Sequence, residues 1–251
     1  MITDVRGRTF RFDSPPGRVV SLVPSLTESL FDLGSGEAVA GATDFCIYPS
    51  DIQCQRVGGT KNPDVAAIRD LQPDLVYMNL EENLRRHGEE IEQFAPVFVS
   101  EPKTVEDVDT LIGILGSIHQ QESRAGELVE MLRVERRALP QRTFTFACAI
   151  WKKPWMWCGG DTYVSALVQS AGGVNVLGHR NRYPEMDLDC MASLEPQIVF
   201  LPDEPYAFTA ADAEEVKART NARVIGPFPG HLFTWHGTRT ILGLRFLRET
   251  L

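Results

Sequence analysis

The 251-residue sequence lacks several features that would identify common classes of protein. It has no run of about 20 apolar residues, the length of a membrane-spanning helix, so we expect no direct membrane insertion. It has no basic excess, because 25 Lys and Arg stand against 34 Asp and Glu, a formal net charge of −9. This balance argues against nucleic acid and anionic membrane surfaces as partners. Residues 1–6 have no apolar signal-peptide core, so we expect either that a signal was removed or that the protein stays in the cytoplasm.

Cysteine is scarce, and motifs for catalysis or metal binding are missing. The five cysteines form no C-x-x-C motif, which argues against a structural zinc site and a disulfide framework; one pair, such as Cys46 and Cys54, stays open. There is no G-x-S-x-G, H-E-x-x-H, G-x-G-x-x-G or Walker sequence. We therefore interpret His231 and His236 as loop residues. The sequence predicts neither an enzyme nor a bound metal or covalent cofactor.

What the sequence does contain is an alternation of short apolar strands and helices, typical of parallel sheets with crossover helices. Leu71–Met78 and Leu194–Leu201 both have the pattern of a helix end, a proline turn and a buried strand. We interpret the two halves as related α/β lobes. Ser25 or Thr27 is expected to cap the first helix, and Asp161 a helix that ends at Ala171. The expected strands lie near 18–23, 39–42, 55–57, 75–78, 97–99, 143–150, 174–176, 198–201 and 223–225, after a hairpin over 2–12.

Between the halves, the spacing predicts a helix over Gln121–Leu139. Ala125, Leu128 and Leu132 lie on one apolar stripe, and Pro140 ends the run. Such a helix is roughly 28 Å long, so it could either lie on the surface of one domain or connect two lobes. The paired halves favour a connector that limits lobe motion. We expect an N-terminal lobe over 1–103, a helical region over 104–139 and a C-terminal lobe over 140–251.

Ligands of open parallel sheets bind beyond the carboxyl ends of the strands. If the two lobes face each other, these loops would surround one cleft, a usual place for a small-molecule ligand. In the second half, the loops are rich in aromatic residues, which offer flat apolar walls with polar tips. These residues are Trp151, Trp155, Trp157, Tyr183, Tyr206, Phe208, Phe233 and Trp235.

Several segments, in order along nearly the whole chain, resemble the substrate-binding proteins of cobalamin and iron–siderophore ABC importers. They are Arg18–Glu28, Val57–Pro63, Leu71–Val76, Gly172–Val176 and Trp235–Arg239, and Thr43–Pro49 with Tyr183 is most similar to the cobalamin-binding branch. The resemblance implies two α/β lobes joined by one long helix, a ligand between them, and an extracytoplasmic, periplasmic location. It further implies a monomer that delivers cobalamin or a related metal chelate to ABC permease subunits. A siderophore or haem receptor, and a cytosolic sensor or enzyme of the same fold, remain alternatives.

The resemblance also assigns roles to particular residues. Phe45 resembles an aromatic wall of the cobalamin pocket, and Arg239 a pocket-edge arginine. Tyr183 stands where the family has a tryptophan, as do Thr60 and Asn79, so the ligand could differ in size or polarity. Asp189 matches a carboxylate that docks on the permease; the other docking position aligns with Ala66, so Asp64 or Asp70 would substitute. The predicted ligand-binding residues are Ser25, Phe45, Tyr48, Lys61, Asn79, Trp151, Trp155, Met156, Trp157, Tyr183, Tyr206, Trp235, His236 and Arg239.

Overall fold

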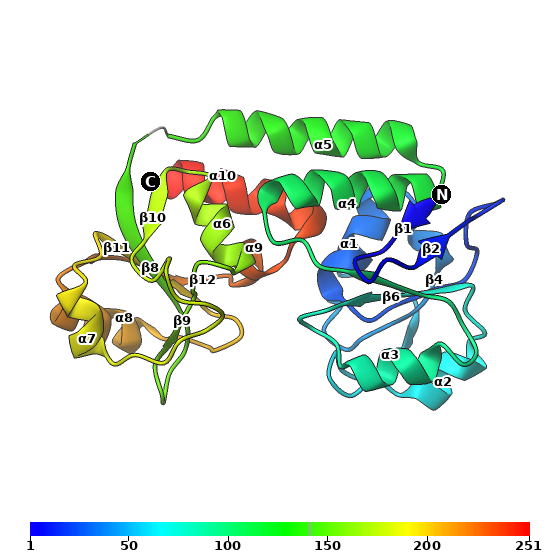
Figure 1. The fold of residues 1–251 in the computed structure, drawn as a ribbon, viewed down its shortest axis with the longest axis horizontal. Helices are drawn as coiled ribbons and strands as arrows, with labels where there is room; N and C mark the ends of the chain where they lie inside the picture. The colour runs from blue at the N-terminus through cyan, green and yellow to red at the C-terminus, as the bar shows by residue number, and fades with distance from the viewer. Residues whose placement is uncertain (141) are drawn as a thin grey trace. The chain divides into compact units, whose positions relative to one another are not determined.

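The structure is a computed structural model that describes residues 1–140 and 142–251 (Figure 1). These residues form two compact units. The N-terminal unit comprises Met1–Pro102 and Asp107–Met131, and the C-terminal unit comprises Lys103–Glu106 and Leu132–Leu251. Each unit contains its own parallel sheet, which confirms the predicted two-lobe α/β fold.

The N-terminal unit is built on a five-stranded parallel sheet in the order β5–β4–β3–β6–β7. Its strands are β3 (Val19–Ser21), β4 (Val39–Ala42), β5 (Gln55–Arg56), β6 (Leu75–Asn79) and β7 (Val97–Ser100). Every residue of β3, β6 and β7 is buried, as expected for parallel strands that helices cover on both faces. After β3 the chain first adds strands on one side and then crosses to the other, so the topological switch point lies between β3 and β6.

The helices of this unit are α1 (Pro24–Asp32), η1 (Gly36–Ala38), α2 (Val65–Asp70), α3 (Arg85–Ile91) and α4 (Val105–Ile118), the last shared with the C-terminal unit at its first two residues. The prediction that Ser25 or Thr27 caps α1 is wrong. Val23 is the N-cap, and Pro24 occupies the first helical position, where a missing N–H costs nothing. The Thr27 hydroxyl instead donates to the Val23 carbonyl oxygen at 3.1 Å inside the helix.

The C-terminal unit contains a second parallel sheet in the order β10–β8–β11–β12, with β9 antiparallel on β8. Its strands are β8 (Phe144–Trp151), β9 (Met156–Trp157), β10 (Gly173–Asn175), β11 (Ile198–Pro202) and β12 (Arg223–Phe228). Its helices are α6 (Tyr163–Gln169), α7 (Leu188–Ser193), α8 (Ala210–Thr220), α9 (His231–Thr234), η2 (Gly237–Arg239) and α10 (Thr240–Thr250). Here the switch point lies between β8 and β11.

Several details of this unit differ from the sequence prediction, and one is that His231, predicted to be a loop residue, begins the short helix α9. Thr162 caps α6 by accepting from the Ser165 N–H, whereas the Asp161 carboxylate accepts from the Arg182 N–H, so Asp161 is not the cap. The prediction missed β9, which is only two residues long. It also missed α8, whose start is marked by a capping box between Thr209 and Asp212.

The two proline turns predicted to be equivalent have the same local structure in their own units. Leu71 is the C-cap of α2 and Leu194 the C-cap of α7. The next residue has a left-handed backbone in both cases, with φ of 47° at Gln72 and 50° at Glu195. A proline and a buried strand, β6 or β11, then follow.

The long helix predicted over Gln121–Leu139 is observed as α5 (Glu122–Arg137). Its residues up to Met131 belong to the N-terminal unit and those from Leu132 to the C-terminal unit. The predicted stripe is buried, and Glu135 near the end of α5 forms ion pairs with Arg245 at 2.8 Å and Arg248 at 2.6 Å on α10. Across the described part of the chain, no helix has both the length and the apolar character needed to cross a membrane.

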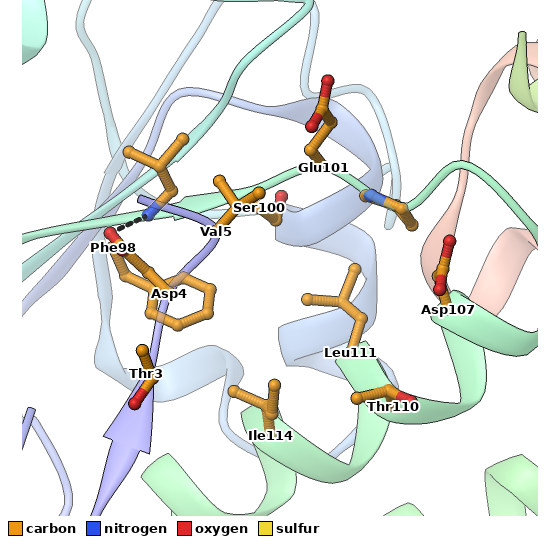
Figure 2. Close-up of a pocket in the computed structure, with 12 residues that line it drawn as sticks. Thr3, Asp4, Val5, Phe98, Ser100, Glu101, Asp107, Thr110, Leu111 and Ile114 are labelled. Atoms are coloured by element: carbon orange, nitrogen blue, oxygen red, sulfur yellow. Dashed lines mark hydrogen bonds between the residues drawn. The ribbon is translucent and has the colours of Figure 1, made fainter. Parts of the chain in front are cut away.

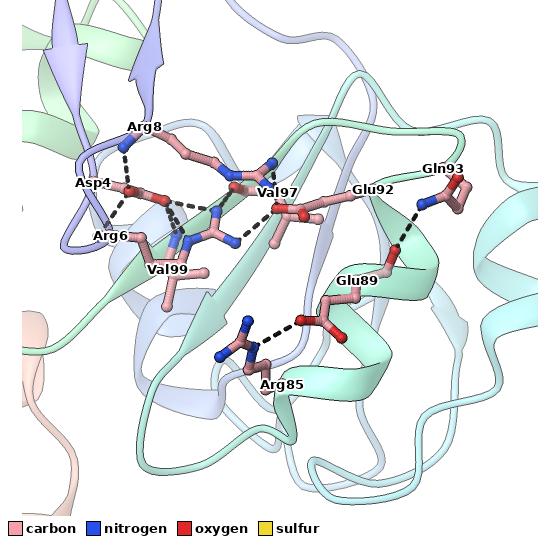
Figure 3. A network of polar contacts seen from close by, with 9 residues as sticks. All are labelled: Asp4, Arg6, Arg8, Arg85, Glu89, Glu92, Gln93, Val97 and Val99. Atoms are coloured by element: carbon pink, nitrogen blue, oxygen red, sulfur yellow. Dashed lines mark hydrogen bonds and ion pairs between the residues drawn. The ribbon is translucent and has the colours of Figure 1, made fainter.

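A short N-terminal hairpin, β1 (Ile2–Thr3) and β2 (Thr9–Phe10), is attached to the N-terminal unit through Asp4 (Figure 3). The Asp4 side chain is fully buried and accepts hydrogen bonds from the backbone N–H groups of Arg6, Arg8 and Val99. It also pairs with the Arg6 guanidinium at 2.7 Å, which in turn reaches Glu92 at 2.7 Å. Asp4 therefore joins the hairpin to the edge strand β7.

Asp4→Ala should lower the free energy of unfolding by about 1–3 kcal/mol, because it leaves the buried Val99 N–H, two partly buried N–H groups and one guanidinium without their acceptor. Urea denaturation measures this loss. Asp13→Ala is the control, since Asp13 is 91% exposed at its side chain and should change stability by less than about 0.5 kcal/mol. Equal effects of the two substitutions would contradict the anchoring role.

Candidate functional site at the carboxyl ends of the sheets

In the N-terminal unit, one buried amide connects the loops at the switch point. The Asn83 Nδ2 donates to the carbonyl oxygens of Leu22, after β3, and Thr60, after β5, at 3.0 and 2.9 Å. Its Oδ1 accepts from the Asn79 N–H at the end of β6 at 2.8 Å. The sequence analysis missed Asn83, because an isolated asparagine four residues after a strand end belongs to no motif. Its contacts show that these three loops are held as one surface.

Loops that follow β4 and β6 in this unit expose large apolar side chains. Phe45 and Ile47 follow β4 and are 58% and 53% exposed, and Leu80 follows β6 and is 47% exposed. Exposed apolar groups that gather in one set of loops are typical of an interaction surface. Phe45 was a predicted site residue, whereas Ile47 and Leu80 were not.

Buried groups beneath Phe45 fix the loop that carries it. The Cys46 thiol lies 3.1 Å from the Thr27 hydroxyl and 3.2 Å from that of Thr43. Arg56 donates to the carbonyl oxygens of Thr43 and Cys46 at 2.8 and 2.9 Å. Burial raises the pKa of the Cys46 thiol, which is therefore uncharged at neutral pH, and both Cys46 and Cys54 are free thiols.

In the C-terminal unit, aromatic rings from both sides of the switch point form a continuous row. Trp151 lies at the end of β8 and is 41% exposed, and its ring centroid is 5.3 Å from that of Tyr206, which follows β11. Phe208 and Trp155 continue the row, with centroid distances of 4.8 and 5.7 Å. Trp155 stacks at 5.7 Å on Trp157, which is fully buried. The row therefore runs from solvent into the core, and only its outer members can contact a ligand.

An ion cluster supports this row. The Lys152 ammonium lies 5.4 Å from the Trp155 ring and pairs with Asp212 and, at 2.7 Å, with Glu215, both on α8. Burial would raise the pKa of Asp212, but hydrogen bonds from Lys152 and Thr209 outweigh it and lower this pKa to about 2. The same carboxylates raise the pKa of Lys152. Both groups are therefore charged near neutral pH, and their ion pair holds the hairpin of β8 and β9 against α8.

The predicted ligand-binding residues that follow β12 lie below the surface. Trp235 and Arg239 are each 6% exposed, with the guanidinium 5.7 Å from the indole ring. The Trp235 Nε1 donates to Glu204 at 3.3 Å, and burial raises the pKa of that carboxyl group. Burial lowers the pKa of His236 to about 4, so its ring is neutral. In this conformation the three predicted residues support the loops from beneath.

The other predicted residues differ in their exposure. Ser25 and Asn79 are buried, and the Asn79 Oδ1 accepts from the Glu81 N–H at 2.8 Å, which turns it away from solvent. Tyr48, Met156 and Tyr183 are half-buried. Lys61 is exposed, and its ammonium donates to the Glu81 carbonyl oxygen at 2.6 Å.

The two predicted docking carboxylates are exposed. Asp189, in the first turn of α7, accepts from the Arg219 Nε at 3.0 Å. Asp64 caps α2 by accepting from the Ala67 N–H at 3.0 Å. Neither contact buries the carboxylate, so both can meet a partner.

The N-terminal unit also contains an open pocket of about 190 Å³ (Figure 2). It is lined by residues of the N-terminal hairpin, the end of β7 and α4, including Asp4, Phe98 and Leu111. None of the predicted ligand-binding residues lines it. Within residues 1–140 and 142–251, no group of three or more His, Cys, Asp or Glu side chains is arranged to hold a metal ion.

The chain belongs to the family described as Periplasmic binding protein, whose pattern it matches over residues 19–224. It is 23% identical, across its whole length and 84% of the relative, to an uncharacterised ABC transporter substrate-binding lipoprotein of Bacillus subtilis. It is 25% identical over 75% of its length to the vitamin B12-binding protein of Vibrio parahaemolyticus, covering 71% of that protein. The periplasmic vitamin B12 binding protein of Vibrio cholerae has the same fold, with a TM-score of 0.79, 19% identity, and 94% and 96% of the two chains covered.

These findings confirm the predicted family, that of ABC substrate-binding proteins for cobalamin, haem and siderophores. Its members bind and deliver ligands and are not catalysts, in agreement with the prediction that the chain is not an enzyme.

Asp212→Asn should lower the free energy of unfolding by on the order of 1–2 kcal/mol at pH 7. Because folding lowers the pKa of Asp212 from about 3.9 to about 2, this stabilisation is present above pH 5 and is lost as the pH falls from about 4 towards 2. Urea denaturation at pH 7 and pH 3 should therefore show a smaller difference from the unsubstituted chain at pH 3. Glu214→Gln, at an exposed position on the same helix, is the control and should change little; a pH-independent effect of Asp212→Asn would contradict the ion-cluster account.

Proposed function

We propose that this protein binds cobalamin or a related corrinoid and delivers it to an ABC permease. The observation that carries the proposal is the exposure of Phe45, Ile47, Leu80 and Trp151 in loops at the carboxyl ends of the two sheets. The name of the Vibrio parahaemolyticus relative supports the choice of ligand.

The chemistry of these loops suits a flat, largely apolar macrocycle with a polar rim. Phe45 and Trp151 offer aromatic faces for the ring, and each large aromatic side chain can bury 150–250 Å² in such a contact. Tyr48 lies in the loop of Phe45 and Tyr183 in the segment that follows β10, and the hydroxyl groups of these half-buried residues could bond to amide substituents. Buried Trp157, Trp235, His236 and Arg239 would act by positioning this outer layer.

A second candidate ligand is an iron chelate, haem or a siderophore. Tyr48 and Tyr183 are half-exposed phenols, and a tyrosine oxygen is an established axial ligand of haem iron. Thr60 and Asn79, where the resemblance implies tryptophans, make the N-terminal loops more polar than in a cobalamin receptor. Absorbance titrations with cyanocobalamin and haemin distinguish the two candidates, because each chromophore shifts on binding.

A protein that delivers a ligand to an importer works outside the cytoplasm. We propose this location for the chain, and that it acts as a monomer. We propose that Asp189 and Asp64 meet basic residues of the permease. Asp189 already pairs with Arg219, so docking would exchange one exposed ion pair for another. Such an exchange costs little, since exposed pairs contribute about 0–1 kcal/mol.

Phe45→Ala and Trp151→Ala should each weaken cyanocobalamin binding at least about tenfold, the equivalent of about 1.4 kcal/mol, because each removes an aromatic contact. Isothermal titration calorimetry measures the dissociation constants. Val134→Ala is the matched control, because Val134 is 48% exposed but lies on α5 and not in these loops. Unchanged affinity in both loop variants would rule out this site, and no heat or spectral change with any chain would rule out the ligand.

A further inference from the structure

Two buried thiols lie opposite each other where β8 leaves the parallel sheet. Cys148 is the last β8 residue paired with β11, and Ala149 is the first paired with β9, opposite Trp157. One step back along this antiparallel register sets Cys148 opposite Cys158. The Cys158 N–H donates to the Cys148 carbonyl oxygen at 2.9 Å, as expected for such a pair.

The geometry of this pair suits a covalent bond between the two sulfur atoms. Opposite residues of antiparallel strands point to the same face, and the Cα atoms of a hydrogen-bonded pair are about 5.5 Å apart. A disulfide has a Cα separation of about 4.4–6.8 Å, and the spacing of such a pair lies within this range. Both cysteines are free thiols in this structure, and burial first, and then the neighbouring Cys158 thiol, raises the pKa of Cys148 well above its usual value. Both side chains are fully buried, so nothing else competes for the sulfur atoms from solvent.

We propose that Cys148 and Cys158 form a cross-strand disulfide when the chain folds in the presence of an oxidising disulfide. The bond would close the base of the β8–β9 hairpin, which carries Trp151 at the end of β8 and Trp155 in the connecting segment. It does not depend on the identity of the ligand or on the proposed transport function. The other three cysteines differ, since Cys46 and Cys54 lie outside the strands and Cys190 lies on the exposed surface of α7.

The oxidant is a small-molecule or protein disulfide, which accepts two electrons. One cysteine thiolate attacks a sulfur of the oxidant, whose S–S bond breaks and releases one thiol. The second cysteine thiolate then attacks the resulting mixed disulfide, forms the Cys148–Cys158 bond and releases the second thiol. The two protons of the cysteine thiols end on the released thiols. Because both side chains are buried, we expect the reaction during folding or on local opening of the hairpin.

The test uses the unsubstituted chain, refolded from urea in a buffer of reduced and oxidised glutathione. Remaining thiols are blocked with N-ethylmaleimide under denaturing conditions, and the digest is analysed by mass spectrometry. We expect a cross-linked peptide pair containing Cys148 and Cys158 in most chains, with Cys190 alkylated. Cys190→Ser is the matched control and should leave the cross-link unchanged. In Cys158→Ser, Cys148 should be alkylated.

Alkylation of both Cys148 and Cys158 in most of the refolded chains would overturn the proposal. So would cross-links that join either residue mainly to Cys46, Cys54 or Cys190. Because the unsubstituted chain decides the result, a folding defect in Cys158→Ser would not weaken the test.

Discussion

The parallel alignment of strands within each sheet is the constraint on which the rest of this structure depends. Parallel strands all end at one edge, so the loops that follow them leave the sheet together. In the N-terminal unit this brings the segments after β3, β4, β5 and β6 to one edge, and in the C-terminal unit those after β8, β11 and β12. Residues far apart in the sequence thus become neighbours, as Trp151 and Tyr206 do.

A parallel edge alone would leave these loops loosely placed, and buried polar contacts fix them. Asn83 joins three loops of the N-terminal unit, and Arg56 holds the loop of Phe45 from beneath. In the C-terminal unit, Lys152 holds Trp155 against α8. Each contact satisfies groups that would otherwise be unpaired, which makes an alternative loop arrangement costly. The backbone of the loops that carry the exposed apolar side chains is therefore fixed, and this arrangement favours a preorganised binding surface.

Alternating strands and helices, proline turns and the stripe of α5 were enough to predict the two-lobe architecture, because these patterns are local. Those patterns did not predict which aromatic side chains are exposed and which are buried in the core. Trp151 and Trp157 belong to one short segment, yet one is exposed and the other buried. Their difference follows from the pairing of β8 with β9, including an irregularity between Ala149 and Trp151, and β9 was too short to predict. Asn83 was missed for a related reason, since its three partners come together only in the folded unit.

We propose that the exposed apolar loops at the carboxyl ends of the sheets bind a corrinoid. The most direct test is the position of cobalt in crystals grown with cyanocobalamin, located by anomalous scattering at the cobalt absorption edge. We expect one strong peak beside the loop of Phe45 or that of Trp151. A peak in the pocket between the N-terminal hairpin and α4, or no peak at saturating ligand, would contradict it.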